Sequence, residues 1–233
     1  RNHSSAASDV YKRQDEIGYP VIIKAAAGGG GIGMQIVHAA NEFEGALKLC
    51  QGRAKSAFGD DRVFVEKYIE GAQHVEFQVL ADGEKAIHFG ERFCSIQRRH
   101  QKLIEEGPWL TDEKRAEVGA LVCAGAESVG YKGLATFEFL RDKNGDFYFL
   151  EVNPRVQVEH TVTELITGYN LVELGIRVAQ GESLPLTQDD ITIRGHAIQC
   201  RLNAEDTTNF VPSPGRLWDC LLYTSDAADD GCV

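Results

Sequence analysis

The clearest pattern in the chain is a period of two near its centre. From residue 151 to 159 the odd positions are Glu, Asn, Arg, Gln and Glu, and the even ones are Val, Pro, Val and Val. This alternation is typical of an extended segment with one buried and one exposed face. Pro154 cannot donate to a sheet ladder, so we expect the strand to end near Asn153 and continue as an extended loop. A solvated edge strand would show the same pattern, so the interpretation depends on the partner strand.

A hairpin predicts that partner. Two alternating, aromatic-rich runs, 135–140 and 147–151, flank Asn144-Gly145, a dipeptide typical of hairpin turns. A two-residue turn there places Glu138 directly opposite Glu151, whereas an odd-length loop would slide the two out of opposition. The Cβ atoms of directly opposed residues lie about 4.5–5.5 Å apart, and two like charges placed there destabilise a sheet. The pair therefore predicts a cation between them.

Glu138, Glu151 and Asn153 form the candidate metal site. Asn153 lies two residues beyond Glu151 and so shares its face. Ligands that are all oxygen favour Mg²⁺ or Mn²⁺ over zinc, and Mg²⁺ usually combines one or two carboxylates with substrate phosphates. The pattern therefore predicts a metal–phosphate site.

The N-terminal part predicts a strand, a glycine-rich loop and a second strand. The first strand, 18–24, ends in Lys24, and the second covers 34–38. The loop contains Gly28, Gly29, Gly30, Gly31 and Gly33. Such glycines let the backbone approach phosphates closely. The motif differs from Walker A and dinucleotide loops, because no Gly-Lys-Ser/Thr follows and a strand comes next. We interpret it as a mobile flap over phosphates, with a flexible linker as the alternative.

Other elements follow from capping residues and periodicity. Asn41, with Glu44 after it, predicts the N-cap of a helix. Its buried face is predicted to be Phe43, Leu47, Cys50 and Ala54. Strands are expected at 62–69, 74–80 and 85–90, and one helix from Thr163 to Gln180. Thr111 is predicted to cap a helix with the buried face Val118, Leu121, Val122, Gly125 and Val129. Residues 195–206 begin an element that the chain does not finish.

Composition narrows the class of protein. The chain has 233 residues, 43% of them hydrophobic and 25% charged, as in soluble globular proteins. A net charge of -11 argues against nucleic acid as the main partner. The absence of a long apolar run or a signal peptide favours no membrane and a cytoplasmic location. The six cysteines form no C-x-x-C pair and indicate reduced thiols.

Two features near residue 100 leave alternatives open. Cys94 could pair with His100 in catalysis, although a buried inert thiol is the favoured interpretation. The basic segment 91–102 is typical of a solvated surface and sometimes of an RNA contact. In an acidic chain with a metal–phosphate site, a loop that binds an anionic substrate is comparably favoured.

The two ends differ from the rest. Back-translated, 4–14 and 220–230 can be opposite strands of one DNA segment read in shifted frames, and that segment resembles a sequencing-library adapter. We interpret 1–14 and 220–233 as non-native tails, with natural polar tails as the alternative. The natural protein is then expected to continue beyond both ends.

Several motifs occur together in order along residues 15–218. They are Lys24 with the glycine loop and Met34, Glu66-Lys67-Tyr68, the run from Cys94 to Lys102, the run from Glu151 to His160, the run from Arg201 to Asp206, and Pro212-Ser-Pro-Gly215. Together they resemble the biotin carboxylase component of biotin-dependent carboxylases, of the acetyl-CoA, propionyl-CoA or pyruvate carboxylase type, in the ATP-grasp superfamily.

The resemblance implies an α+β, partial ATP-grasp fold. Residues 15–67 match the lid subdomain, 68–193 the core with the metal and bicarbonate site, and 194–219 the start of the biotin carboxylase C-terminal domain. Family members use ATP, Mg²⁺ and bicarbonate to form carboxyphosphate, and then carboxylate biotin on a carrier protein. The implied partners are a biotinyl carrier, a carboxyltransferase and, at full length, a second copy. Because the family's N-terminal domain and most of its C-terminal domain are missing, the chain by itself is expected to be inactive.

The resemblance also implies a role for individual residues. The nucleotide contacts are Lys24, Gly28, Gly29, Gly30, Gly31, Gly33, Met34, Glu66, Lys67, Ile69, His74, Gln97 and His100. The metal ligands are again Glu138, Glu151 and Asn153. The bicarbonate pocket is Lys102, Arg155, Gln157 and Val158. Glu159 matches the base that deprotonates bicarbonate, and Arg201 the residue that stabilises the biotin enolate.

Two departures and two alternatives accompany this interpretation. Ile32 stands where many members carry Arg or Lys, and 107–110 is shorter than usual. A carbamoyl-phosphate-synthase-type ligase also activates bicarbonate, although Gln157-Val158-Glu159-His160 argues against it. A truncated ATP-binding module without activity is the other alternative. Biotin-dependent ATP hydrolysis separates the three.

Overall fold

The computed structural model describes residues 17–27, 33–98 and 101–215. The chain divides into two compact units after Gly71, and each is described by itself. Four predicted flap glycines, Gly28 to Gly31, lie outside the described residues, as do Ile32, His100 and both end segments.

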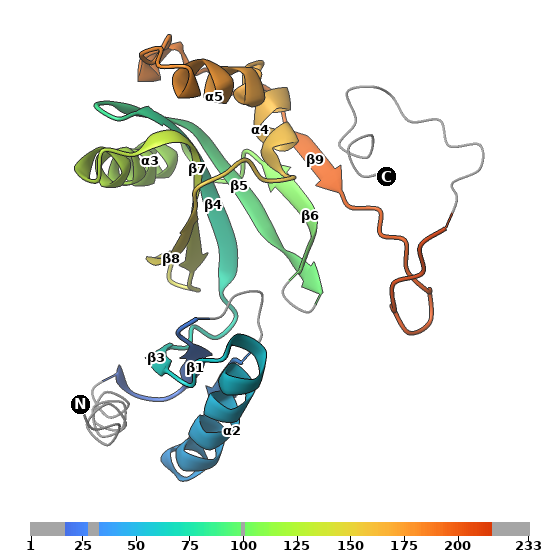
Figure 1. Ribbon diagram of the computed structural model, residues 1–233. Helices are drawn as coiled ribbons and strands as arrows, with labels where there is room; N and C mark the ends of the chain where they lie inside the picture. The colour runs from blue at the N-terminus through green and yellow to red at the C-terminus, as the bar shows by residue number, and fades with distance from the viewer. Residues whose placement is uncertain (1–16, 28–32, 99–100, 216–233) are drawn as a thin grey trace. The chain divides into compact units, whose positions relative to one another are not determined.

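The first unit packs one helix on a three-stranded antiparallel sheet (Figure 1). Its strands are β1 (Val21–Ala25), β2 (Gln35–Val37) and β3 (Val63–Lys67), in the order β2-β1-β3. The helix is α2 (Ala40–Phe58), and its buried residues are the predicted Phe43, Leu47, Cys50 and Ala54. These side chains pack on Val21, Ile23 and Val37, so the helical period in the sequence predicts this core correctly.

The predicted cap of α2 is wrong. Ala39, with an extended backbone and no side-chain hydrogen bond, occupies the N-cap, and Asn41 lies inside the helix. Instead, the carboxylate of Glu42 accepts a hydrogen bond from the backbone N–H of His38 at 3.1 Å. An acid in the first turn therefore satisfies a free donor at this end of the helix.

The second unit is built on a six-stranded antiparallel sheet in the order β8-β7-β4-β5-β6-β9. The strands are β4 (Gln73–Asp82), β5 (Ala86–Arg98), β6 (Gln101–Gly107), β7 (Lys132–Arg141), β8 (Phe147–Asn153) and β9 (Ala197–Cys200). The strand predicted at 85–90 thus continues through Arg98, so most of the basic segment is strand rather than loop. Charged residues of this segment, such as Glu91 and Arg92, are fully buried with partners, which the polar sequence does not reveal.

Helices cover both faces of this sheet (Figure 1). The odd residues of β4 from Val75 to Ala81 pack against α3 (Asp112–Ser128). Leu80, on the opposite face, packs against α5 (Leu171–Ala179). The polar even residues His74, Glu76 and Gln78 therefore share the face that carries α5. Among the described residues, no helix is long and apolar enough to cross a membrane.

The N-cap of α3 is confirmed, but its predicted buried face is only partly correct. The Thr111 hydroxyl accepts from the N–H of Lys114 at 3.3 Å. Val118 and Val122 are buried as predicted, whereas Leu121 and Val129 are 65% and 75% exposed and Gly125 is also exposed. The buried stripe instead includes Arg115, Gly119 and Ala126. The prediction from apolar residues alone misplaced this face, because Arg115 is buried through its ion pair with Glu91.

The single helix predicted from Thr163 to Gln180 is two helices, α4 (His160–Thr167) and α5. Gly168, with φ of 77°, ends α4 in the left-handed region, where glycine is favoured. The Asn170 side chain then caps α5 by accepting from the N–H of Glu173 at 2.8 Å. A short 3₁₀ turn, η1 (Gln188–Asp190), follows.

Candidate active site

The β7–β8 hairpin sets the first part of the site. The predicted two-residue turn is wrong, because the loop covers residues 142–146 and the first strand pair is Arg141 with Phe147. A bulge next to Glu138 then shifts the register by one residue. As a result Glu138 lies opposite Glu151, as predicted, and Thr136 lies opposite Asn153.

Strand register extends this pair into a row across four strands. Arg92 of β5 pairs with Glu76 of β4, Glu76 with Glu138 of β7, and Glu138 with Glu151 of β8. Paired residues of neighbouring strands point to the same face of a sheet. One cation and three acids therefore stand side by side on the face that carries α5.

Arg92 anchors one end of this row and is fully buried. Its Nε donates to Glu76 Oε1 at 2.7 Å, and its Nη1 donates to Gln78 Oε1 at 2.9 Å and Thr163 Oγ1 at 2.7 Å. Burial alone would lower the pKa of Arg92, but Glu76 and Glu159 raise it above its usual value. The guanidinium is therefore charged and fixed by several bonds.

Lys102, from β6, brings a second cation to three of the acids. Its Nζ donates to Glu159 Oε1 at 2.6 Å, to Glu138 Oε1 at 3.0 Å and also to Glu76 Oε2. Burial alone would lower the pKa of Lys102, but the carboxylates, Glu76 first, raise it well above the usual range. The ammonium is therefore protonated at any physiological pH.

Glu159, at the start of α4, lies between two cations and is 2% exposed. Lys102 holds its Oε1, and Arg201 Nη2 donates to its Oε2 at 2.7 Å. Burial raises the pKa of Glu159, but Lys102 and Arg92 outweigh burial and lower it overall. The carboxylate is therefore ionised near neutral pH, as an acceptor of protons has to be.

Arg201 is held in turn by Glu105 of β6. Its Nε lies 2.7 Å and its Nη2 2.6 Å from Glu105 Oε1. Glu105 is fully buried, and burial raises the pKa of this carboxyl although Arg201 opposes the shift. Within the described part of the chain, Glu105 Oε2 has no hydrogen-bond partner.

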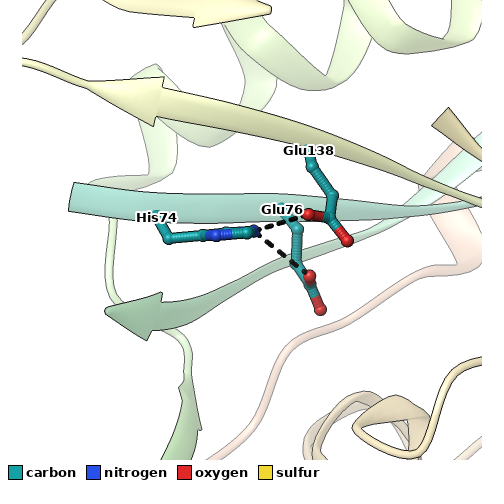
Figure 2. A group of neighbouring side chains, drawn as sticks. All are labelled: His74, Glu76 and Glu138. Carbon is teal, nitrogen blue, oxygen red and sulfur yellow. Dashed lines mark ion pairs between the residues drawn. The ribbon is translucent and has the colours of Figure 1, made fainter. Parts of the chain in front are cut away.

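Glu138 contacts four side chains besides those of the neighbouring acids. Its Oε1 also accepts from Asn153 Nδ2 and from Gln157 Nε2, each at 2.9 Å. His74 Nε2 lies 2.8 Å from Glu138 Oε2 and 3.8 Å from Glu76 Oε2 (Figure 2). Burial raises the pKa of Glu138, but His74 and Lys102 outweigh it and bring the pKa to about 2.

The structure bears on where a metal ion would fit. The ligand atoms of His74, Glu76 and Glu138 lie within 4.8 Å of one another (Figure 2). Glu76, however, is already paired with both Arg92 and Lys102. Glu151 is exposed, and the only hydrogen bond recorded to its carboxylate among the described residues comes from Asn153 Nδ2 at 3.3 Å. The oxygen-rich set Glu138, Glu151 and Asn153 therefore suits a hard divalent cation better, although a bound cation would require the Asn153 amide to turn its oxygen toward the acids.

The remaining bicarbonate residues follow β8 in the chain. Gln157 is buried, and its Oε1 has no partner within the described segments. Arg155 is exposed and its Nη2 donates to Asn153 Oδ1 at 3.3 Å, while Val158 is 52% exposed. The structure thus brings Gln157 to Glu138, but leaves Arg155 and Val158 at the surface of the second unit.

The predicted nucleotide residues divide between the two units. In the first, Lys24 forms an ion pair with Glu66, and Lys67 Nζ donates to two backbone carbonyls, of Gly18 at 3.0 Å and Tyr19 at 3.1 Å. This unit also holds Gly33, with φ of 75°, and the half-buried Met34 and Ile69. In the second unit, Gln97 Nε2 lies 3.0 Å from His74 Nδ1.

The sequence analysis missed three charged residues of the site, Glu76, Arg92 and Glu105. A signal for Glu76 was present: in the predicted strand 74–80 the polar residues His74, Glu76 and Gln78 alternate with apolar ones. Arg92 and Glu105 lie in strands with charges on both faces, so periodicity gives no comparable signal for them.

Comparison with known proteins agrees with the fold and with the resemblance. Residues 2–187 match the family described as the carbamoyl-phosphate synthase L chain, ATP binding domain. A biotin carboxylase of Allochromatium vinosum is 53% identical over 88% of this chain and 46% of that protein. A pyruvate carboxylase subunit of Methanothermobacter thermautotrophicus is 56% identical over 87% of this chain and 42% of that protein.

Solved structures give the same result. The biotin carboxylase domain of Hydrogenobacter thermophilus 2-oxoglutarate carboxylase, a dimer in complex with MgADP, ADP and bicarbonate, matches with a TM-score of 0.84 and 47% identity, over 88% of this chain and 46% of that one. A biotin carboxylase from Campylobacter jejuni, in a β-γ-ATP complex, matches with a TM-score of 0.85 and 49% identity, over 90% and 48%. The chain therefore spans about half the length of its relatives. It belongs to the family of the carbamoyl-phosphate synthase L chain ATP-binding domain, has the α+β ATP-grasp fold, and groups with the biotin carboxylases of that family.

Proposed function

We propose that this chain is part of an ATP-dependent ligase that carboxylates biotin on a carrier protein through carboxyphosphate. The observation that carries the proposal is the buried Glu159 carboxylate, with one oxygen paired with Lys102 and the other with Arg201. A base between two fixed cations suits a reaction in which an anion is first bound and then deprotonated.

The first step is phosphoryl transfer to bicarbonate. A bicarbonate oxygen attacks the γ-phosphorus of ATP, the bond to the bridging oxygen breaks, and ADP leaves. The bicarbonate proton passes to Glu159. Lys102, which remains charged, binds the anion together with Gln157, and Arg155 and Val158 complete the proposed pocket. Removing the proton strengthens a poor nucleophile.

When Glu159 takes up a proton it loses its charge, which weakens its ion pairs with Lys102 and Arg201 and allows one of these cations to be released. Arg201 is the more accessible of the two, since its side chain is 26% exposed and that of Lys102 is 11% exposed. We propose that Arg201 is the cation that Glu159 releases. Its guanidinium is then free to stabilise the enolate that forms when the ureido nitrogen of biotin gives its proton to the departing phosphate. That nitrogen takes the carboxyl group as the bond between the carboxyl carbon and the phosphate oxygen breaks.

ATP is the second substrate of the proposed reaction. The contacts in the described segments are Lys24, Gly33, Met34, Glu66, Lys67, Ile69, His74 and Gln97. Glu138, Glu151 and Asn153 would hold Mg²⁺ or Mn²⁺, which neutralises charge on the transferring phosphoryl group. Lys102 contacts Glu138 directly, so the anion pocket adjoins the metal ligands.

The partners follow from the same reaction. A biotinyl carrier has to present biotin, and a carboxyltransferase has to consume carboxybiotin. A homodimer is proposed for the whole protein, because the biotin carboxylase domain of the Hydrogenobacter relative is a dimer. Some relatives are chloroplastic, so a cytoplasmic location remains a prediction.

The second candidate is a ligase of the carbamoyl-phosphate synthase type, which the description of the matched family favours. Both candidates activate bicarbonate, and the acceptor separates them. The test uses the complete natural chain that carries this sequence, with Mg–ATP and bicarbonate, and adds either free biotin or ammonia. We expect biotin to accelerate phosphate release and ammonia to have no effect. Acceleration by ammonia alone would favour the second candidate, and no bicarbonate-dependent release with either acceptor would contradict both.

A further inference from the structure

We propose that Glu76 and Glu105 are positioning residues, and that each fixes the position of one of the two cations that flank Glu159. Glu76 fixes Lys102 for bicarbonate, and Glu105 fixes Arg201 for biotin. The inference rests on the proposed function, which assigns those substrates to the two cations.

Glu76 is placed so that it cannot move independently of the sheet. It is fully buried, and its two oxygens are shared between Arg92 Nε, at 2.7 Å, and Lys102. Arg92 is itself tied to Gln78 and Thr163. A lysine ammonium sits on a flexible four-carbon stem, so its position depends on such a partner.

Glu105 plays the matching part for Arg201. One oxygen of this fully buried acid receives both Nε and Nη2 of the guanidinium. The backbone N–H of Arg201 also donates to Leu103 O at 2.9 Å, so its main chain is attached to β6 as well. The other terminal nitrogen, Nη1, is not needed for either contact.

Charge alone does not explain these two acids. Arg92, Lys102 and Arg201 are outnumbered by Glu76, Glu105, Glu138 and Glu159. Acids next to an anion pocket weaken anion binding by repulsion. A buried ion pair is also weak evidence for added stability, because desolvation offsets its attraction. The contribution that fits both acids is therefore to orient Lys102 and Arg201.

Loss of the charge of Glu76 and loss of the charge of Glu105 should therefore impair different steps of the reaction. Without the Glu76 charge, Lys102 loses one of its three carboxylate partners, and bicarbonate binding suffers. Without the Glu105 charge, Arg201 loses its buried support, and transfer to biotin suffers while bicarbonate binding is preserved. A purely structural role would affect both steps alike.

The test compares Glu76→Gln and Glu105→Gln in the complete natural chain that carries this sequence. We expect Glu76→Gln to raise the KM for bicarbonate by about tenfold or more, equivalent to about 1.4 kcal/mol. We expect Glu105→Gln to lower the biotin-dependent rate by a similar factor with little change in that KM. Wild-type protein must first show biotin-dependent phosphate release; if it does not, the proposed function fails rather than this inference.

Glu91→Gln is the matched control. Glu91 is also a fully buried strand glutamate with an arginine partner, Arg115, whose Nε lies 2.6 Å away. It pairs in register with Phe77 and so points to the opposite face of the sheet. We expect Glu91→Gln to lower the melting temperature but to change neither the KM for bicarbonate nor the biotin-dependent rate of the folded protein.

A double-mutant cycle and a milder variant complete the test. If Glu76 acts through Lys102, Glu76→Gln should change the KM for bicarbonate little once Lys102 is replaced by Gln. Should Glu76→Gln fail to fold, Thr163→Val removes one anchor of Arg92 with little change in shape, and it should still raise that KM. Equal effects of Glu76→Gln and Glu91→Gln, additive effects in the cycle, or an unchanged KM in Thr163→Val would overturn the inference.

Discussion

At the scale of single residues, Glu159 concentrates the chemistry that the site can perform. Its Oε1 is bound to Lys102 and its Oε2 to Arg201, and it is ionised although buried. We predict that Glu159→Gln lowers bicarbonate-dependent ATP cleavage by roughly 10²–10⁴-fold, the usual contribution of a general base. Nucleotide affinity should hardly change. Steady-state rates and equilibrium binding of ATP measure the two, with exposed Glu113→Gln as control; a fall in affinity without a fall in rate would make Glu159 a structural residue.

The paired acids Glu138 and Glu151 give a second prediction for single residues. Each gives the other a like charge across the hairpin, which a divalent cation offsets. We predict that Glu138→Gln or Glu151→Gln raises the Mg²⁺ concentration needed for half-maximal ATP cleavage by at least about tenfold. A Mg²⁺ titration at fixed ATP measures this. Normal turnover by both variants at limiting Mg²⁺ would remove the metal assignment.

At the scale of elements, the hairpin shows what the sequence could predict. The prediction that Glu138 lies opposite Glu151 is confirmed, although the two-residue turn from which it followed is wrong. The turn was not predictable from Asn144-Gly145, because the Asp142 side chain closes a longer loop by accepting from the N–H groups of Asn144 and Asp146. The bulge beside Glu138 then corrects the register. The strands leave the loop with Arg141 opposite Phe147 and reach the site one residue out of that register, with Glu138 opposite Glu151, and the bulge accommodates the difference.

The misplaced features have similar causes. The face of α3 was misjudged because Arg115 is buried with an ion-pair partner, and the basic segment because Arg92 is buried with one ion pair and several hydrogen bonds. Sequence patterns count charges as exposed, whereas partners from distant segments can bury them. The parts of the site that depend on such partners, Arg92 and Glu105 among them, emerge only from the folded structure.

The break between α4 and α5 gives a stability prediction. Gly168 has φ of 77°, and a methyl group added there would meet open space, so Gly168→Ala should cost about 1 kcal/mol through backbone strain alone. Gly125, inside α3, meets only an ordinary contact with Phe137 at 3.6 Å. Gly125→Ala should therefore stabilise the protein by about 0.5–1 kcal/mol. Chemical denaturation measures both, and a shift of the same sign for the two would contradict this account.

Asp82 gives a prediction for pH. Its carboxylate accepts from the N–H groups of Leu184, Lys85 and Glu84, which lowers its pKa from 3.8 to about 2. Because the folded-state pKa is below the unfolded one, this contribution to stability is present above about pH 4 and is lost as the pH falls toward 2. Asp82→Asn should be less stable than wild type at pH 6, with the difference shrinking near pH 2. A difference that is constant over this range would rule out the titration of Asp82 as the cause.

At the scale of the whole molecule, each of the two units carries residues with a proposed role. The first unit holds Lys24 and Glu66, and the second holds the row of acids with Lys102, Glu159 and Arg201. The chain spans about half the length of its relatives, so the complete reaction is a property to test on the complete natural chain. The central claim is that bicarbonate, rather than water, attacks ATP at this site.

Isotope transfer tests that claim most directly. The complete natural chain is incubated with Mg–ATP, biotin and bicarbonate labelled with ¹⁸O, and the released phosphate is analysed by mass. If bicarbonate attacks the γ-phosphorus, one bicarbonate oxygen remains on phosphorus when carboxyphosphate breaks down, so each phosphate carries one labelled oxygen. The account predicts that label, and a loss of its rate of appearance in Glu159→Gln. Phosphate released in a biotin-dependent reaction but free of the bicarbonate label would show water as the nucleophile and contradict the account.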